Sequence, residues 1–539
     1  MRRSCTVFLT LLGAVASSLA AGVTVQKPSL TVPTQYASQK AAAEKIFTTS
    51  YAAYREFAFG HDELLPVSLG LGDDLGGWGA SLVDAMGTLV VMGFDDLFLE
   101  AVNFTSTIDF NTPPVPQLIS VFETNIRWIG GLISAYELSG EKFPILITKA
   151  KEIADKLAFA WIDGNAIPYN SLDFTTNSPV IENNNIAQIG TLTLEWAALT
   201  KYTGNATYKE LAEKGTIAVA ELAAPLPGLA AQSVDPATGQ FTDATITWGG
   251  GSDSYFEYLL KYARYTNNAN NIFIDTWKTA VDSSIHALLR TSTVGNWSFL
   301  ADRSDQGLIE HVGSHLACFY AGNWLLGGQL LRNQTIVDIA LELNEGCWNT
   351  YAGTATGIGP ENFAFISADG NFTGGDAITA DQLAFYNEHG YYITHPDYIQ
   401  RPEVLESNFY AWRVTGDTKY LDRAADAIAS FNKFLPATVA FAGLNDVNDP
   451  GAGLFDDMES FWFAEVLKYL YLTFDDPNHI SLDTHVWNTE CHPLIAPPAL
   501  SSYQGSGTLI PPKPFTTPTP ITPGPVPSPR TQPLGVPAQ

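Results

Sequence analysis

Acidic side chains occur inside four otherwise apolar helical stretches that lie far apart in the chain. The stretches read SVFETNIRWIGG, GGGSDSYFEYLL, RPEVLESNFYAW and FDDMESFWFAEVL. Carboxylates avoid apolar surroundings because losing hydration is costly, so they stay there only with partners or a chemical task. We therefore expect one acidic pocket built by convergent helices. Such a pocket is typical of glycoside-cleaving or metal-assisted hydrolases.

Two of these stretches place a carboxylate one helical turn from another charged residue. Glu123 precedes Arg127 by four residues, and nearly every other side of that helix is apolar, which favours a pocket over a surface ion pair. Asp253 and Glu257 are also one turn apart. Asp253 follows the sequence GGGS and so lies at or near a helix start, where a carboxylate could also simply cap the helix.

The third stretch begins with a proline and two acids. Pro402 suits the first turn of a helix, and Glu403 and Glu406 suit its positive end. The aromatic residues of the following NFYAW could stack on a sugar ring, although aromatic residues at helical spacing are more often core. This stretch is therefore compatible with a sugar site and with ordinary helix-dipole chemistry.

The fourth stretch precedes a group of oxygen-bearing residues near the end of the domain. Glu459 and Glu465 flank an aromatic run, and Thr489, Glu490 and His492 lie just beyond it. Carboxylates near a threonine could hold a hard cation such as calcium, although no EF-hand loop is present. The sequence also lacks a dinucleotide-binding glycine motif after a strand, a Walker loop and an HExxH motif.

Length, composition and charge narrow the class of protein. The chain has 539 residues, of which 46% are hydrophobic and only 16% charged, so it can bury a large core. The formal net charge of −28 argues against nucleic acid as a partner, because binding it needs a basic surface.

The N-terminus has the pattern of a secretory signal. Arg2 and Arg3 precede a short apolar run and then small residues, so we expect a signal peptide over residues 1–21 and secretion of the mature chain. The run is shorter than the roughly 20 residues of a membrane span, which disfavours an uncleaved anchor. Secretion agrees with five possible N-glycosylation sites, at Asn103, Asn205, Asn296, Asn333 and Asn371.

Cysteine content is also compatible with secretion. The mature chain keeps Cys318, Cys347 and Cys491, which allow one disulfide and one free thiol. A bond between Cys318 and Cys347 would close the shortest loop, so we favour that pair. The spacing does not fit a zinc site.

The chain divides into a long helical part and a short biased tail. From about Ser501 onward the sequence is rich in Pro, Thr and Gly and cannot form a packed core. We expect a catalytic domain over residues 22–495 and a disordered tail over residues 496–539.

Within the domain, helical runs repeatedly end in a similar stop followed by a new helix. Gly and Asn adopt the left-handed conformation that closes a helix. The stops lie at Gly93, Gly140, Gly204, Asn267, Gly328 and Gly416, and more loosely at Asp475. Seven stops predict seven helical hairpins, and a deep pocket favours closing them into a ring over an open solenoid or an irregular bundle. We expect an all-α (α/α)7 barrel with short β pieces in loops, for example around residues 240–247 and 363–372.

These segments together resemble the class I α-1,2-mannosidases of glycoside hydrolase family 47. The matching stretches run in the family's order from about residue 72 to 494 and include GGWGASLVDAMGTLVVMG, VFETNIRWIGGLISAYELSG, DSYFEYLLKY, HLACFYAGN, RPEVLESNFYAWRVTGD, SFWFAEVLKYLYLTF and VWNTECHP. The resemblance implies the (α/α)7 fold. It also implies removal of terminal α-1,2-linked mannose from high-mannose N-glycans, with inversion and bound Ca2+.

The resemblance assigns roles to individual positions. Glu123 matches the general acid, Glu403 the favoured base, Asp253 a third essential carboxylate that has also been argued to be the base, and Thr489 the direct calcium ligand. The remaining matches are Asp84, Glu257, Glu361, Glu406, Glu465 and Glu490 in the acidic shell, Arg127, His315, Arg401 and Phe461 in substrate contact, and Cys318 with Cys347 as the disulfide.

Two positions depart from the family pattern. Gly87 stands where the family usually has an aspartate, which removes an acidic group near the site. Gly251 stands where endoplasmic-reticulum members carry an arginine that restricts them to one glycan branch, so we expect trimming of several branches.

Our prediction is a secreted, monomeric, calcium-dependent mannosidase without a membrane anchor after signal cleavage. The alternatives are a catalytically weak, lectin-like protein of the same fold, a six-hairpin glycosidase acting on α-glucans, and a protein whose buried acids are only structural.

Overall fold

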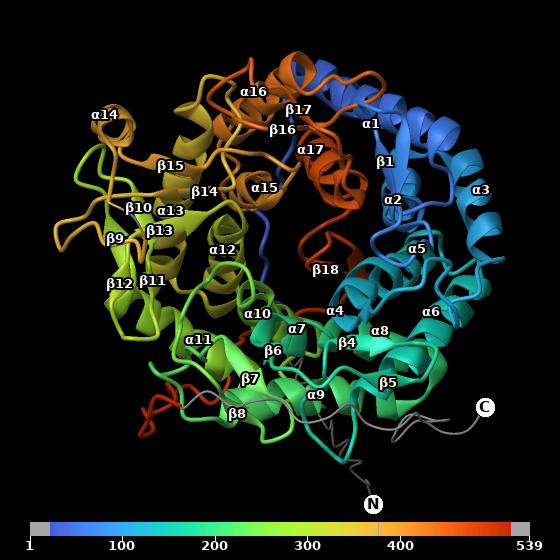
Figure 1. Ribbon diagram of the computed structural model, residues 1–539, viewed down its shortest axis with the longest axis horizontal. Helices are drawn as coiled ribbons and strands as arrows, with labels where there is room; N and C mark the ends of the chain where they lie inside the picture. Colours follow the sequence, from blue (N-terminus) through green and yellow to red (C-terminus); the bar gives the residue numbers. More distant parts are fainter. Residues whose placement is uncertain (1–21, 376, 519–539) are drawn as a thin grey trace, which may run out of the picture.

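The computed structural model describes residues 22–375 and 377–518 of the chain, and its helices form a closed ring of pairs (Figure 1). The predicted signal peptide and the last part of the predicted tail lie outside the described residues. The inner helices are α2 (Ala80–Met92), α5 (Gly130–Leu138), α8 (Thr193–Thr203), α10 (Asp253–Tyr265), α12 (Phe319–Leu331), α15 (Glu403–Thr415) and α17 (Leu467–Thr473). Their outer partners, in the same order, are α3 (Asp95–Thr105), α6 (Pro144–Leu157), α9 (Ala206–Glu221), α11 (Asn271–Ala287), α13 (Gln334–Ala352), α16 (Lys419–Phe434) and α1 (Ala37–Phe57).

The ring is closed by contacts between neighbouring inner helices. Each inner helix packs on the next one along the chain, and α17 packs on α2. The first outer helix, α1, pairs with the last inner helix, α17, so the two ends of the domain are joined. Seven hairpins are therefore present in the described part of the chain, as the sequence predicts.

Side-chain patterning explains which helix of each pair lies inside. In α10 every residue after Asp253 is buried, whereas in α16 the buried residues form a single stripe. A helix that is buried on all sides belongs to the interior, and one with a single apolar stripe covers it from outside.

Most predicted helix stops lie at the turns inside the hairpins. Gly93, Gly204 and Gly416 directly follow α2, α8 and α15 and have positive φ. The stop predicted at Gly328 is wrong, because α12 continues to Leu331 and Arg332 adopts the left-handed conformation instead. Gly328 has another role: a Cβ atom there would lie 2.6 Å from a methyl carbon of Val337, so glycine allows α12 and α13 to approach closely.

Short strands and small helices lie in the connections between the helices of the ring. The strands are β1 (Glu63–Leu65), β2 (Gly70–Gly72), β3 (Ile119–Ser120), β4 (Ser171–Asp173), β5 (Ser178–Pro179), β6 (Asn184–Asn185), β7 (Ser233–Asp235), β8 (Gln240–Phe241), β9 (Leu289–Thr291), β10 (Ser298–Leu300), β11 (Asp302–Arg303), β12 (Ile309–Glu310), β13 (Val312–Ser314), β14 (Asn362–Ala364), β15 (Tyr392–His395), β16 (Gly443–Leu444), β17 (Leu454–Phe455), β18 (His485–Trp487) and β19 (Pro493–Ile495). They form small antiparallel sheets, and the expected β pieces around residues 240–247 and 363–372 include β8 and β14. The remaining α-helices are α4 (Val121–Thr124), α7 (Ile186–Gly190) and α14 (Ala380–His389).

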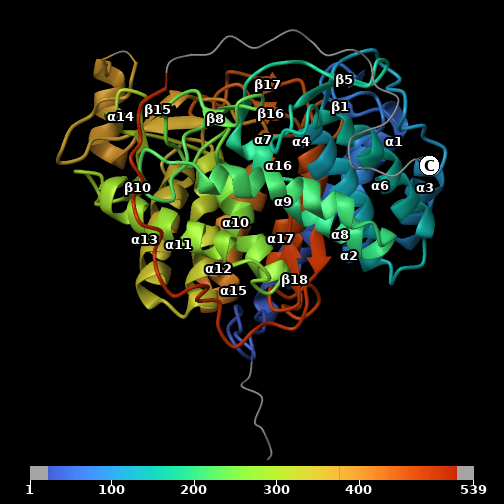
Figure 2. The same cartoon turned by 90° about the horizontal axis from the view of Figure 1, so that it is seen from below.

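The two ends of the ring differ. Many labelled strands, among them β1, β5, β8, β15, β16 and β17, gather at one end in Figure 2. The β18–β19 hairpin instead lies toward the opposite end, and β18 is seen within the ring in Figure 1. The tip of this hairpin, residues 488–492, therefore reaches the barrel interior from the side opposite the strands.

The segment that follows β19 has packing or hydrogen-bond partners as far as Phe515. It contains no helix or strand in its described part, but Tyr503 is buried and its hydroxyl donates to Asn267. The backbone N–H of Ser506 donates to the carboxylate of Asp275 on α11. The predicted boundaries of domain and tail stay predictions. None of the described helices has the length and hydrophobicity needed to cross a membrane.

Candidate active site

Most of the predicted site residues line one cavity of about 290 Å³. Those that line it are Glu123, Arg127, Asp253, Arg401, Glu403, Phe461, Glu465, Thr489 and Glu490. Glu257 and Glu406 line a smaller space of about 30 Å³ that also touches Asp253, Glu403, Glu465 and Thr489. Asp84, His315 and Glu361 do not line the cavity, but each contacts a residue that does. These contacts are to Arg127, Glu403 and Arg401, respectively.

Glu123 and Arg127 come from a helical segment with a π-helical turn. Ser120 accepts a hydrogen bond from the N–H of Glu123 and starts the segment, which then widens into a π-helix over Asn125–Ile129. Arg127 donates to the carboxylate of Glu123 at 2.9 Å. A second π-helical turn, Trp462–Val466, carries Glu465. Such turns change which side a helical residue faces, and they are frequent at functional sites.

Arg127 binds several acids at once. Its Nη1 donates to Ser460 at 2.6 Å and to Glu490 at 3.0 Å, and it lies 3.8 Å from Asp84. Burial alone would lower the pKa of Arg127, but the charges of Glu490, Glu123 and Asp84 raise it well above its usual value. The guanidinium therefore stays charged and holds these carboxylates in place.

Asp253 is the first residue of α10, as expected from the glycines before it. It is half-buried, and its carboxylate accepts the N–H of Ser254 at 2.7 Å. Burial raises the pKa of Asp253 to about 7, and the charges of Glu257 and Glu403 act in the same direction. The pocket position that the sequence allowed is therefore present, whereas the N-cap of α10 is Ser252, whose side chain makes no capping hydrogen bond.

Glu403 is the first residue of α15, and Pro402 precedes it. Burial would raise the pKa of Glu403, but the hydrogen bond from His315 and the charges of His315 and Arg401 hold it below its usual value. Nε of Arg401 in turn lies 2.7 Å from each carboxylate oxygen of Glu361. Glu403 is thus an ionised carboxylate next to Asp253, whose pKa is raised.

Several carboxylates surround Thr489 without enough cations to balance them. Burial and the charges of Glu490, Glu403 and Glu406 raise the pKa of Glu465 well above its usual value. Lys261 is one buried ammonium on this side; it binds Glu257 and lies 3.9 Å from Glu406. A site with many oxygen atoms and excess negative charge fits a hard cation such as calcium. Thr489 and these acids are the residues that would hold it.

The turn that carries Thr489 rests on residues that the sequence analysis did not single out. Tyr258 on α10 accepts the N–H of Thr489 at 3.2 Å and donates to Glu195 on α8 at 2.6 Å. Asn488 also donates to Glu195, at 2.9 Å, and accepts the N–H groups of Glu490 and His492. Glu195 is an acid inside the apolar stretch TLTLEWAAL, so the pattern that revealed the other acids could have revealed it too.

Two further sequence expectations can be placed. Cys318 and Cys347 form a disulfide that joins the start of α12 to α13, and Cys491 is a buried free thiol, so the predicted pairing is confirmed. At Gly87, a Cβ atom would lie 3.6 Å from Nζ of the buried Lys468, which donates instead to the carbonyl of Cys491. An acidic residue at position 87 would face this lysine, so its absence leaves Lys468 with a backbone partner.

Comparison with known proteins agrees with this geometry. The sequence model described as glycosyl hydrolase family 47 matches residues 46–496. The chain is 37% identical over 513 residues to the probable mannosyl-oligosaccharide α-1,2-mannosidase 1B of Aspergillus clavatus, covering 90% of this chain and 98% of that protein. It is also 37% identical over 479 residues to the mannosyl-oligosaccharide α-1,2-mannosidase 1B of Aspergillus phoenicis, covering 85% and 91%.

Comparison with a solved structure also indicates an α-1,2-mannosidase fold. The fold is similar to that of the α-1,2-mannosidase from Trichoderma reesei, with a TM-score of 0.82, 37% identity and coverage of 86% of this chain and 99% of that one. The prediction of an (α/α)7 barrel is therefore confirmed. The chain belongs to glycosyl hydrolase family 47.

Proposed function

We propose that this protein is a calcium-dependent, inverting exo-α-1,2-mannosidase that removes terminal mannose from high-mannose N-glycans. The observation that carries the proposal is the single cavity lined by Glu123, Asp253, Glu403 and Thr489. The printed names of the relatives, which are α-1,2-mannosidases, support the same sugar and linkage.

The proposed reaction uses two carboxyl groups in different protonation states. Glu123 donates a proton to the glycosidic oxygen as the bond from that oxygen to the anomeric carbon breaks. Glu403 removes a proton from a water whose oxygen attacks the opposite face of the anomeric carbon, which inverts its configuration. The lowered pKa of Glu403 supports its role as the base, because a base must be ionised before it acts.

The other residues bind and orient the sugar. Arg127 fixes Glu123 through the bond of 2.9 Å, and Phe461 lies beside the Arg127 guanidinium, 5.6 Å from ring centre to Cζ. Asp253 at the start of α10 can bind a sugar hydroxyl or the attacking water. Thr489 and the acids around it would hold calcium, which would supply a positive charge that attracts sugar oxygens and lowers the energy of the transition state.

Breadth of branch specificity is part of the proposal. Gly250 and Gly251 line the cavity without side chains, and Gly251 has a φ of +85°. A large residue at position 251 would narrow the cavity, so glycine supports acceptance of several glycan branches.

We also infer that the protein enters the secretory pathway and acts as a monomer. Four of the predicted glycosylation sites have exposed asparagines, at Asn103, Asn296, Asn333 and Asn371, and Asn205 is half-buried as the N-cap of α9. Glu123, Asp253, Glu403 and Thr489 of a single chain line one cavity, so one copy can supply these four groups.

The experiment that tests the function is mannose release from α-1,2-mannobiose and from a high-mannose glycan. The proposal expects free mannose from both substrates, loss of release after treatment with a chelator, and recovery on addition of calcium. Glycan binding without mannose release would instead support the lectin-like alternative.

A further inference from the structure

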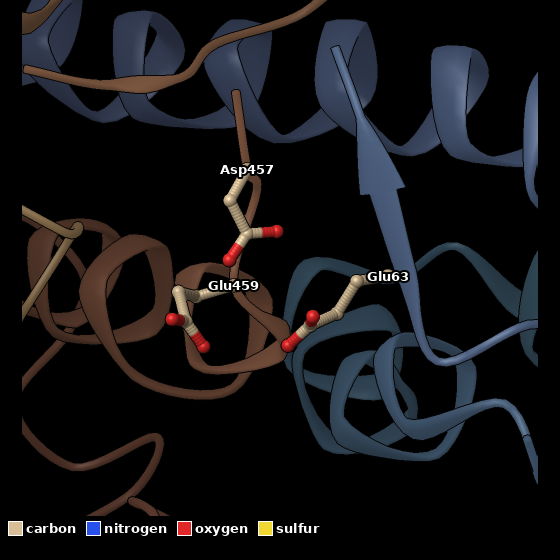
Figure 3. A group of neighbouring side chains, drawn as sticks. All are labelled: Glu63, Asp457 and Glu459. Carbon is tan, nitrogen blue, oxygen red and sulfur yellow. The ribbon is translucent and has the colours of Figure 1, made fainter. Parts of the chain in front are cut away.

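Three carboxylates outside the pocket come together without a cationic partner. They belong to Glu63, Asp457 and Glu459, and one oxygen of each lies within 4.8 Å of the others (Figure 3). Arg127 and Arg401 form their direct ion pairs with Glu123, Glu490 and Glu361. Their charges also act on Glu459, but they do not cancel the rise in its pKa that burial causes. None of the three acids forms an ion pair within residues 22–375 and 377–518.

The fold brings these acids together through one backbone contact. Leu64 on β1 and Met458 form an antiparallel bridge, in which the N–H of Met458 donates to the carbonyl of Leu64 at 3.0 Å. Side chains of the residues on either side of such a bridge share one face. Glu63 therefore faces Asp457 and Glu459, although nearly 400 positions separate them in the sequence.

The carboxylate of Glu63 gives an independent sign of a missing ligand. Glu63 is only 9% exposed, and among the described residues no protein group donates a hydrogen bond to its carboxylate. Figure 3 shows it directed toward the other two carboxyl groups. Oδ1 of Asp457 is also buried and without a partner. A buried polar group is stable only with a partner, so this cluster lacks either protons or a cation.

The electrostatics of the cluster describe its state without a cation. Burial, together with the charges of Glu459 and Asp457, raises the pKa of Glu63 to about 10. Burial and the charge of Glu459 raise the pKa of Asp457 to about 8. The exposed Asp74 adds further negative charge near Asp457 from the solvent side. An acidic approach of this kind attracts cations from solution.

We propose that Glu63, Asp457 and Glu459 form a binding site for a divalent cation of the calcium type, separate from the site at Thr489. Hard cations take carboxylate oxygens as ligands, and all three groups supply them. None of the three lines the cavity that contains Thr489. A cation here would tie β1 to the segment that leads directly into Ser460 and Phe461, and so would fix one wall of the pocket.

The test counts calcium ions on the full-length protein. Calcium chloride is titrated calorimetrically into chelator-treated wild type and into Asp457→Asn. The proposal expects the variant to bind one ion fewer per chain than wild type. Asp449→Asn is the matched control, because Asp449 is an exposed acid in the same connection whose side chain accepts only the N–H of Gly451, and it should bind as many ions as wild type. Equal numbers in wild type and Asp457→Asn would overturn the proposal.

A second variant and a second readout cover the case in which Asp457→Asn does not fold. Glu63→Gln should also lose one ion. Calcium binding to the wild-type cluster should also release protons, and Glu63→Gln should release fewer. The number released is obtained from the dependence of the binding heat on the buffer. If neither variant folds, a wild-type count below two ions per chain contradicts the proposal. Mannose release from the same samples reports on the proposed function separately.

Discussion

Nδ1 of His315 lies 2.7 Å from a carboxylate oxygen of Glu403. A carboxylate can only accept, so Nδ1 carries a proton, and Nε2 lies 2.8 Å from the hydroxyl of Tyr351. Together with Arg401, this arrangement lowers the pKa of Glu403 although the residue is buried. The base proposed for the reaction is thus kept ionised by its surroundings.

Replacing His315 tests this relationship. In His315→Gln the carboxylate of Glu403 loses a charged donor, so its pKa rises and the acidic limb of the kcat/KM profile moves to higher pH. The profile is measured on α-1,2-mannobiose. His311→Gln is the control, because His311 is also buried but binds Ser367 and Asp369 outside the pocket, and its profile should match wild type. An unshifted profile in His315→Gln would contradict the role assigned to this contact.

Glu123→Gln tests the proposed acid. The amide cannot donate the proton that the leaving oxygen needs, so kcat should fall by roughly 10²–10⁴-fold. Thermal unfolding should stay close to that of wild type, because Glu123 is partly exposed and glutamine has the same shape. A variant that unfolds would favour the structural interpretation of the buried acids, and a variant with full activity would rule out Glu123 as the acid.

Tyr258→Phe tests how Thr489 is positioned. The substitution removes the acceptor of the Thr489 N–H and the partner of Glu195. Loss of a contact that orients a metal ligand lowers affinity by roughly 10–100-fold, so calcium binding should weaken accordingly in a calorimetric titration. Tyr262→Phe is the matched control, one turn along α10, where the hydroxyl donates to Glu213 at 2.7 Å and no contact reaches Thr489. If Tyr258→Phe and Tyr262→Phe bound calcium with the same affinity, Tyr258 would not be the residue that positions Thr489.

Stability should fall as the pH rises toward neutrality. Burial raises the pKa of Asp253 and of Glu195 to about 7, above the value of about 4 in an unfolded chain. The folded state therefore binds these protons more tightly, and the stabilisation is complete below about pH 4 and lost as the pH passes through about 7. The free energy of unfolding from urea titrations in the presence of a chelator should decrease over this range. In Glu195→Gln the decrease should be smaller; a stability that rises between pH 5 and 7 in wild type would contradict the pKa directions.

Much of the ring could be predicted because its signals are local. Glycine tolerates positive φ, so Gly93, Gly204 and Gly416 indicate where inner helices end. Gly328 misled the prediction because its small size serves helix packing, while Arg332 adopts the strained conformation. Which residue ends α12 depends on how the helix packs against α13, and a local sequence pattern does not contain that information.

The site was partly predictable for a related reason. An acid inside an apolar helix indicates a carboxylate that faces the interior of the barrel, and this pattern located Glu123, Asp253, Glu403 and Glu465. The two π-helical turns have no such signature, and the contacts of Arg127 with Ser460 and Glu490 are seen only in the structure. Glu63 was also missed, since it lies on a short strand and becomes a neighbour of Asp457 only through the bridge of Leu64 and Met458.

The most direct test of the central claim is proton NMR of α-1,2-mannobiose during the first minutes of hydrolysis with calcium present. The proposed arrangement of Glu123 and Glu403 predicts that β-mannose appears first and that the α-anomer follows only by mutarotation. Initial release of α-mannose would contradict the inverting mechanism, and absence of any free mannose would contradict the assignment of this cavity as a mannosidase site.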